Sequence, residues 1–452
     1  MATTRNSPRV DLTTGPVHKH LIRMALPMVI GLMANMSFTF VDLFYIGMLG
    51  TDELAAMGFI SRMAMIVISA SIGLSAGISS VLARAAGNKD DEEIKCLATN
   101  TLLFTVILSL TFTVVGLLTI DPLFTAMGAE EKILPLIREY VTIWYLSPIF
   151  IMVPMTGGAA MRALGDTGLQ GKLMLFSALA NAVLDPILIF GLIGFPELGF
   201  QGAAIASLIT RFISFAAIIY FLTYRFHVLS FEKTTLSNFL PSIKRTLHVG
   251  IPATGTNMVI PIVAAIIISI IARYGSDAVA ATNVATTIEA LSLVLFFALS
   301  SVVGPFLGQN IGAGNFDRIE ECIKKVAIFC LVWGGLMAVL LGLLANTLAG
   351  LFSDDPKITS LTSSYLYVVP ASYGLYGIVM SANAMFNSIG KPMPGVVISA
   401  LRVFFLQLPL VYAASRFYDL ETAFMVISVS NMIADIVGFL WISRTIRNLK
   451  PL

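Results

Sequence analysis

The chain is poor in charged residues. Only 12% of its 452 residues are Asp, Glu, Lys or Arg, about half the share found in an average soluble domain. The net charge is +2, and the sequence contains no basic face with interleaved aromatic residues, so it does not indicate nucleic-acid binding. This composition instead predicts an integral membrane protein.

Cysteine, histidine and the usual catalytic motifs are also scarce. The three cysteines have no metal-ligand spacing and are too few for a disulfide framework, and the four histidines are scattered. The sequence contains no His-Glu-x-x-His and no nucleotide-binding P-loop. The polar stretch 1–16 lacks the pattern of a cleavable signal peptide. We therefore predict a protein that is not an enzyme and that needs no cofactor.

Long apolar runs are what the sequence has in abundance. Hydrophobic residues make up 57% of the chain, and a membrane-spanning helix needs about 20 of them in succession. Twelve such runs can be counted, and they predict an all-α protein with twelve transmembrane helices. The predicted spans are 20–47, 54–83, 96–120, 134–160, 169–193, 202–224, 245–271, 279–308, 320–349, 358–385, 394–415 and 421–443.

The distribution of Lys and Arg predicts the orientation. With twelve spans both termini share one side, and 21 of the 28 basic residues fall on that side. Five fall on the opposite side, and two, Arg62 and Arg211, are embedded in spans and assigned to neither side. Because basic loops stay in the cytoplasm, we expect a multi-pass protein of the cell (inner or plasma) membrane with both termini cytoplasmic.

The two halves of the chain resemble each other at one constant offset in the numbering. Pro27 aligns with Pro252, Gly50 with Gly275, and Gly165 with Gly390. We therefore predict an N-terminal lobe of six helices over 1–224, a cytoplasmic linker over 225–244 and a C-terminal lobe over 245–452. Because six is even, the two bundles should be parallel-related around a central cavity, an arrangement typical of transporters.

The first predicted span carries one acid, Asp42, and a proline, Pro27. A carboxylate inside a bilayer costs several kcal/mol, so it indicates function unless it reaches the interface at the helix end, which is the alternative here. Asn35 lies two turns earlier and so shares the helical face of Asp42. Asp42 aligns with Ile267 in the second half, so this acid occurs only in the first lobe.

A second acid occurs in the fifth span, where Asn181 and Asp185 share a helical face and Pro186 weakens the backbone ladder. If Asp185 meets Asp42, the buried pair tends to hold one proton because two nearby anions repel each other. The same carboxylates with the oxygen of Asn181 could instead hold Na⁺. Ser207 is a possible further oxygen ligand. The alternatives are hydrogen bonds of Asp185 and Ser207 to nearby backbone.

Substrate-binding candidates follow from position and composition. Asn35, Met24, Phe38 and Tyr45 lie on or near the Asp42 face and are the candidates on the first span. The 21 Met and 30 Phe suit a soft, aromatic cavity. Glu289, well inside its span, is the second-lobe acid best placed for a cationic substrate. Elsewhere in this lobe, we expect Arg402 to extend to the cytoplasmic interface and Asp435 to pair with a cation of a neighbouring helix.

These motifs together resemble the multidrug and toxic compound extrusion (MATE) family. The resemblance rests on Pro27 with Asp42, Asn181 with Asp185-Pro186, Arg162-Ala-Leu-Gly-Asp-Thr167 and the paired loops 84–96 and 309–322, and it covers essentially the whole chain. It is closest to the DinF-like branch, because the predicted spans 245–271 and 358–385 contain no acid, unlike the NorM branch.

The resemblance implies a secondary active antiporter that exports amphipathic, often cationic, drugs or toxic compounds by alternating access. It implies a cation site at Asp42, Asn181 and Asp185, with the first helix bending at Pro27 on protonation. We favour inward H⁺ as the coupling ion, with Na⁺ as the alternative. We expect a monomer with membrane lipids and small molecules as its partners.

Three other classes, a lipid flippase, a major-facilitator transporter and an intramembrane enzyme, fit the sequence less well. A lipid-linked oligosaccharide flippase of the same superfamily would usually have more embedded basic residues than Arg62 and Arg211. A major-facilitator transporter would have a basic loop between spans two and three, where this chain is acidic from Asp90 to Glu93. A pump driven by ATP would need a separate partner chain. The flippase stays open as an alternative.

Overall fold

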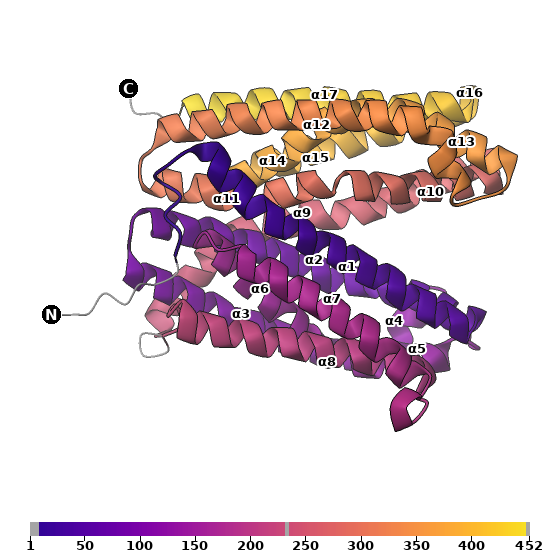
Figure 1. The fold of residues 1–452 in the computed structure, drawn as a ribbon, viewed down its shortest axis with the longest axis horizontal. Helices are drawn as coiled ribbons and strands as arrows, with labels where there is room; N and C mark the ends of the chain where they lie inside the picture. Colours follow the sequence, from indigo (N-terminus) through magenta and orange to yellow (C-terminus); the bar gives the residue numbers. More distant parts are fainter. Residues whose placement is uncertain (1–8, 231–234, 449–452) are drawn as a thin grey trace. The chain divides into compact units, whose positions relative to one another are not determined.

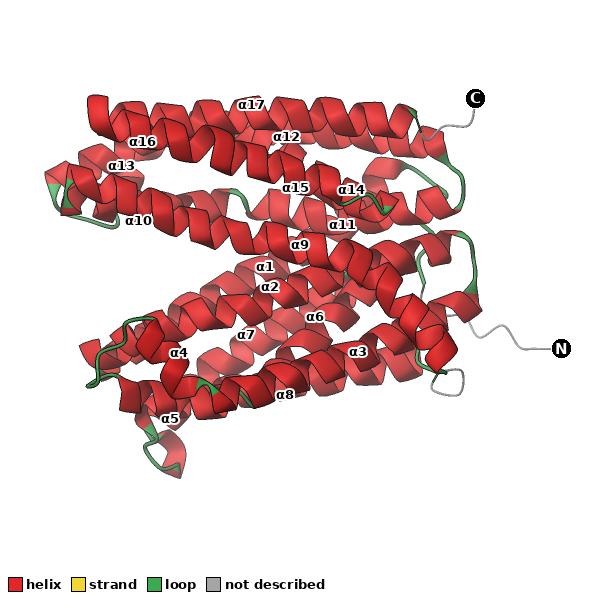
Figure 2. Cartoon of the chain, turned by 180° about the vertical axis from the view of Figure 1, so that it is seen from behind, coloured by secondary structure: helices red, strands yellow, loops and turns green. Residues whose placement is uncertain are grey.

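The computed structural model describes residues 9–230 and 235–448, and within these ranges it contains helices and loops but no strands (Figure 2). The α-helices are α1 (Val17–Leu49), α2 (Thr51–Gly87), α3 (Asp91–Leu118), α4 (Ile120–Ala126), α5 (Leu134–Trp144), α6 (Pro148–Ala163), α7 (Gly168–Ile189), α8 (Gly199–Tyr220), α9 (Leu236–Ile271), α10 (Ser276–Ser292), α11 (Val294–Gly312), α12 (Phe316–Gly350), α13 (Pro356–Val368), α14 (Tyr373–Ile389), α15 (Met393–Ala400), α16 (Leu408–Phe417) and α17 (Leu420–Arg447). Short 3₁₀ or π turns are η1 (Leu192–Gly194), η2 (Phe221–Arg225), η3 (Ala272–Tyr274), η4 (Val369–Ser372) and η5 (Leu401–Gln407).

All twelve predicted spans are helical, although three of them are broken. In the described ranges, ten helices are long and apolar enough to cross a membrane, and α5 with α6, bent by 49°, makes an eleventh. The predicted span 279–308 is divided into α10 and α11, and 358–385 is divided into α13 and α14 by η4. The all-α membrane fold expected from the sequence is therefore confirmed.

The chain divides into two compact units, and it passes between them inside helices. Unit 1 comprises the described part of Met1–Asp11 and Leu26–Thr254, and unit 2 comprises Leu12–Ala25 and the described part of Gly255–Leu452. Thus α1 begins in unit 2 and ends in unit 1, whereas α9 does the reverse. The predicted linker 225–244 is shorter than expected, because α9 already begins at Leu236.

Unit 1 is built around α2, which packs against α3 and α6, while α7 packs against α8 (Figure 1). Its apolar core includes Ile78 and Val81 of α2, Leu97 of α3 and Met161 of α6, all buried. The helices also approach closely at small residues, which allows tight packing of apolar spans.

Unit 2 has α14 beside α11, α12 and α17 (Figure 1). The α12–α14 contact is closest at Gly334 and Gly374, where a Cβ added to Gly334 would lie 2.3 Å from the Cα of Gly374. A side chain at this crossing would push the two helices apart, so glycine is required there for steric reasons.

The internal repeat is visible in the backbone. Gly165, just after α6, and Gly390, just after α14, both have left-handed conformations, with φ of 87° and 79°. Gly50 and Gly275 are the residues before the first turns of α2 and α10. Equivalent glycines thus perform the same local task in each half, as their constant offset in the sequence predicts.

Candidate functional site

Helices α1 and α7 run side by side in unit 1 and touch closely at their starting ends. A Cβ added to Gly171 of α7 would lie 2.3 Å from the carbonyl oxygen of Pro27, and one added to Gly31 would lie 3.2 Å from the Cα of Gly171. Asp42 follows Pro27 along α1, and Asp185 follows Gly171 along α7, by almost the same stretch of helix. In each case the stretch is about four turns, or roughly 20 Å, so the two acids lie at the same level.

The structure brings Asp42 and Asp185 together, as the sequence predicts. Asp42 is 5% exposed and Asp185 is fully buried, and the two carboxyl groups lie close enough to interact electrostatically. Asn181, 1% exposed and one turn before Asp185, is the nearest polar neighbour of that acid on α7. Two buried carboxyl groups with an amide between apolar helices therefore form one polar site.

This site has unused hydrogen-bonding capacity. Among the described residues, no partner in strict hydrogen-bond geometry exists for Oδ1 of Asp42, for either oxygen of Asp185, or for the amide oxygen and nitrogen of Asn181, although Asn181 lies near enough to Asp185 to act on it as a donor. A buried polar atom without a partner costs about 1–3 kcal/mol, more when it is charged. Five such atoms at one place indicate that a proton, water or cation completes the site.

Two further residues belong to the site, and the sequence analysis did not assign them to it. Tyr140 of α5, 1% exposed, lies within the electrostatic reach of both acids. Arg211 of α8 acts electrostatically on Asp42; it donates a hydrogen bond to Oγ of Ser147 at 3.1 Å and stands 5.9 Å from the ring centre of Trp144. The position of Arg211 inside an apolar span was the available signal, since a buried cation needs a partner. Tyr140 had no such signal.

Ser207 is buried on α8, one turn before Arg211. No contact joins Ser207 to the acids in the described structure. Thr210, its neighbour on the same helix, donates a hydrogen bond to the backbone oxygen of Ser207 at 3.0 Å. The role of Ser207 as a cation ligand stays a prediction.

The predicted substrate contacts on α1 are distributed along the helix. Asn35 is exposed, whereas Phe38 and Tyr45 are half-buried, and the Tyr45 ring lies 6.1 Å from that of Phe190. Met24 is buried and belongs to unit 2, and along the helix it precedes Asp42 by about five turns. All four stay predictions as substrate-binding residues.

Unit 2 contains a second buried charged cluster. Glu289 of α10 accepts a hydrogen bond from the hydroxyl of Tyr365 and interacts electrostatically with Arg402, as does Asp435 of α17. Among the described residues, neither oxygen of Asp435, which is fully buried, has a hydrogen-bond partner. The predicted interaction of Asp435 with a cation of a neighbouring helix agrees with this arrangement.

The expectation that Arg402 extends to the membrane interface was wrong. Arg402 lies in η5 and is only 9% exposed, with its guanidinium carbon 4.9 Å from the ring centre of Tyr376. The physical reason is that two buried acids on neighbouring helices, together with the face of an aromatic ring, offer the cation a favourable internal site.

A metal site of the usual kind was not found in the described residues, where no three His, Cys, Asp or Glu side chains gather. Asp42, Asn181 and Asp185 provide instead two carboxylates and one amide oxygen, the hard oxygen ligands that Na⁺ or a proton requires. A ligand set of this kind is able to hold a proton or a small cation.

An all-helical membrane protein with two sequence repeats and a buried acid pair on adjacent spans has the design of a membrane transporter. The MatE family model matches the chain twice, over residues 27–187 and 252–413. The chain therefore belongs to the MatE family of multidrug and toxic compound extrusion transporters. The two matches begin at Pro27 and Pro252, so they reproduce the internal repeat with the same offset.

Known relatives and structures agree with this assignment. The FAD transporter of Shewanella oneidensis is 33% identical over 442 residues, which cover 98% of each chain. The probable multidrug resistance protein YoeA of Bacillus subtilis is 27% identical over 82% of this chain and 81% of its own. The crystal structure of the Vibrio cholerae MATE transporter VcmN in the bent form is 30% identical, with a TM-score of 0.91 over 95% of this chain and 97% of that chain.

Membership of this family confirms several predictions from the sequence. The chain is a multi-pass membrane transporter that handles small molecules, and it is not an enzyme. Its relatives include multidrug efflux proteins.

Proposed function

We propose that this protein is a secondary active exporter that couples efflux of amphipathic, often cationic, compounds to inward movement of H⁺ by alternating access. Asp42 and Asp185 hold the proton, with Asn181 beside them. The observation that carries the proposal is the set of five buried polar atoms without partners on these three residues. A bound proton or cation would satisfy the oxygens among these atoms, and the cost of burying them without a partner favours its binding.

Protonation is coupled to the first helix through its contact with α7. When one of the two acids binds a proton, their mutual repulsion is removed. The preferred distance between α1 and α7 therefore depends on whether the proton is bound. At the other end of the same helix pair, the backbone of Pro27 rests on Gly171. Pro27 lacks an N–H and interrupts the helical ladder there, so we propose it as the point at which α1 bends. The existence of a relative in a bent form supports this assignment.

H⁺ is favoured over Na⁺ by the neighbourhood of the acids. Arg211 already provides a positive charge that acts on Asp42. With this cation already beside Asp42, H⁺ is favoured because one of two buried carboxylates that repel each other takes up a proton readily. Na⁺ coupling at Asp42, Asn181 and Asp185 remains the alternative that the experiment must separate.

The test is transport by the purified protein in liposomes. Efflux of a lipophilic cationic dye is followed under a pH gradient, a Na⁺ gradient, both and neither. Wild type is compared with Asp42→Asn and Asp185→Asn. The matched control is Asp52→Asn, which removes an exposed acid of the same unit whose partner is Lys132 at 2.6 Å.

Dye efflux driven by the pH gradient in wild type and Asp52→Asn, and lost in both site variants, is the expected result. Efflux that needs only Na⁺ would keep the site and change the ion. Full activity of Asp42→Asn would overturn the assignment and direct attention to Glu289 and Asp435, and Glu289 stays a predicted substrate contact until then.

Export of a flavin dinucleotide is a second candidate function. It is favoured by 33% identity to an FAD transporter over 98% of both chains. FAD carries a pyrophosphate, which arginine binds well, and Arg211 is an embedded arginine near the acid pair in unit 1. Loading the same liposomes with FAD instead of dye tests this candidate directly. If neither compound moves under any gradient, the flippase alternative gains support.

We further propose the DinF-like branch, because both site acids lie in unit 1 on α1 and α7. We also propose that the protein acts as a monomer among lipids in the inner or plasma membrane, with both termini in the cytoplasm. The excess of basic residues on the side of the termini supports this orientation. The orientation is tested by introducing single cysteines into the loops of the protein and measuring, in intact cells, which of them a membrane-impermeant thiol reagent labels.

A further inference from the structure

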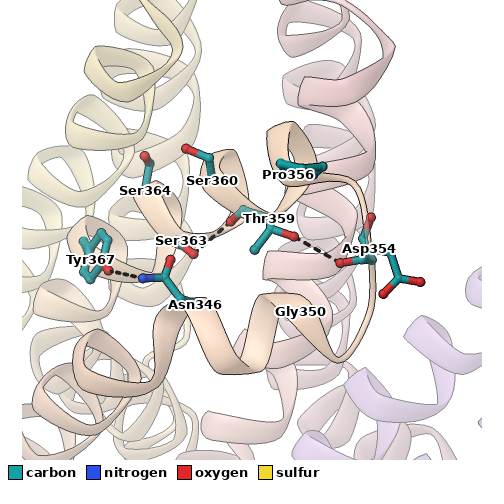
Figure 3. A pocket seen from close by; sticks show the side chains of 10 residues that line it. Asn346, Gly350, Asp354, Pro356, Thr359, Ser360, Ser363, Ser364 and Tyr367 are labelled. Carbon is teal, nitrogen blue, oxygen red and sulfur yellow. Dashed lines mark hydrogen bonds between the residues drawn. The ribbon is translucent and has the colours of Figure 1, made fainter.

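A polar groove lies in unit 2, where α12 ends and α13 begins (Figure 3). Its volume is about 550 Å³, enough for a small organic group. It belongs to unit 2, whereas Asp42 and Asp185 belong to unit 1, so it is a site of its own. It is lined by Asn346, Gly350, Ser353, Asp354, Pro356, Thr359, Ser360, Ser363, Ser364 and Tyr367.

Hydroxyl and amide groups dominate this lining. Thr359 donates to the backbone oxygen of Ser353 at 3.1 Å, Ser363 to that of Thr359 at 2.8 Å, and Ser364 to the carboxylate of Glu421 at 3.0 Å. A hydroxyl that donates to the protein keeps its lone pairs as acceptors for the O–H groups of a ligand. The groove therefore presents several acceptors at fixed positions.

Asn346 and Tyr367 form one wall. The amide nitrogen of Asn346 donates to the hydroxyl of Tyr367 at 3.4 Å, and Figure 3 shows the two side chains meeting across the groove. The Tyr367 side chain is 55% exposed, so its ring offers an apolar face beside the polar groups. A ligand that carries both O–H groups and apolar C–H faces would fit such a wall.

The charge of the lining excludes anionic ligands. Asp354 is the one ionisable carboxylate among the lining residues, and none of them is Lys, Arg or His. A phosphate or carboxylate would find no counter-ion there, whereas the hydroxyls of a neutral ligand can donate to Asp354 and accept from Asn346.

The groove lies at the end of a membrane-spanning helix. α12 is among the helices that can cross the membrane, and the groove begins in its last turns. Leu343, Leu351 and Phe352, in and directly after these turns, are 81%, 75% and 51% exposed. Exposed apolar side chains beside a polar groove at a helix end match a lipid whose chains lie along the helix and whose headgroup sits at the interface.

We propose that this groove binds a neutral polyhydroxylated group, such as the sugar of a glycolipid or a free saccharide. Its hydroxyls bond to Asn346, Asp354 and the serine hydroxyls of α13, and one C–H face lies against the ring of Tyr367. This site is independent of the acid pair and of the transport cycle proposed above.

The test uses full-length protein purified in a detergent without a sugar headgroup. The protein is placed in phosphatidylglycerol nanodiscs with or without a monoglucosyl diacylglycerol, and the retained lipid is identified by native mass spectrometry. Saturation-transfer NMR with methyl glucoside in the same discs provides the arm for a free saccharide. Asn346→Leu and Ser360→Leu fill the groove, and Thr347→Leu is the matched control on the neighbouring, exposed position of α12.

Selective retention of the glycolipid by wild type and Thr347→Leu, reduced roughly tenfold by Asn346→Leu and Ser360→Leu, is expected from the loss of the polar contacts. Saturation transfer to methyl glucoside with the same variant pattern would assign the group to a free saccharide. The proposal is overturned if wild type prefers neither sugar probe, or if Thr347→Leu loses binding as much as the groove variants. Dye or FAD transport is measured separately and does not enter this comparison.

Discussion

Replacing Gly171 by alanine tests whether the α1–α7 contact controls the acid pair. The added Cβ would lie 2.3 Å from the carbonyl oxygen of Pro27, well inside van der Waals contact. The two helices must separate, and overpacking of this kind costs about 1–3 kcal/mol. The higher helix propensity of alanine offsets up to about 1 kcal/mol of that loss. We expect a lower melting temperature than wild type.

Transport should fall together with stability, because moving α7 away from α1 also moves Asp185 away from Asp42. The assay is dye efflux under a pH gradient beside thermal unfolding of the same preparation. Gly47→Ala on α1 is the matched control, since its Cβ would meet no atom within 4 Å, and it should melt at or above the wild-type temperature. A Gly171→Ala variant as stable and active as Gly47→Ala would refute the reasoning.

Three further predictions concern other parts of the chain. Arg402→Leu should lower the free energy of unfolding by on the order of 3 kcal/mol because it leaves buried acids without their cation, and adding Asp435→Asn should restore part of the loss in thermal unfolding. The hydrogen bond and charge of Lys357 lower the pKa of Asp277. The stabilisation by this pair should therefore be complete at pH values above the ordinary pKa of an aspartate, and it should be lost as the pH falls through the lowered pKa of Asp277. The melting temperatures of Asp277→Asn and wild type should then agree only in acid. Asp90→Ala should cost about 1 kcal/mol of stability, because the Asp90 side chain caps α3 by accepting from the Glu93 amide at 2.9 Å.

The helices and the acid pair were predictable from the sequence because both depend on local chemistry. Apolar runs of fixed length identify spans, and an acid inside such a run is conspicuous. Asp42 and Asp185 could be paired since each is private to the first half of the repeat. The approach of the two acids agrees with that inference.

Residues whose environment is created by other helices were not predictable. Arg402 was interpreted from its position near a span end, but the buried acids beside it come from α10 and α17, far along the chain. Tyr140 carries no sequence signal at all, because a tyrosine in an apolar helix is ordinary. The breaks between α10 and α11 and within 358–385 were also missed, since apolar composition alone does not reveal where a helix changes direction.

The passage of α1 and α9 between the two compact units has a consequence for how the protein is assembled. Helices α1 and α9 each contribute residues to both units. Neither half of the chain therefore contains all the residues of one unit. Expressing the two halves separately should give fragments that are stable only in each other's presence, like partners that have exchanged a helix. Each crossing point also lies close to a proline, Pro27 in α1 and Pro252 in α9. The two crossings that occur inside helices are thus near places where the helical ladder is interrupted, so the repeat that duplicated the bundle also duplicated this weak point.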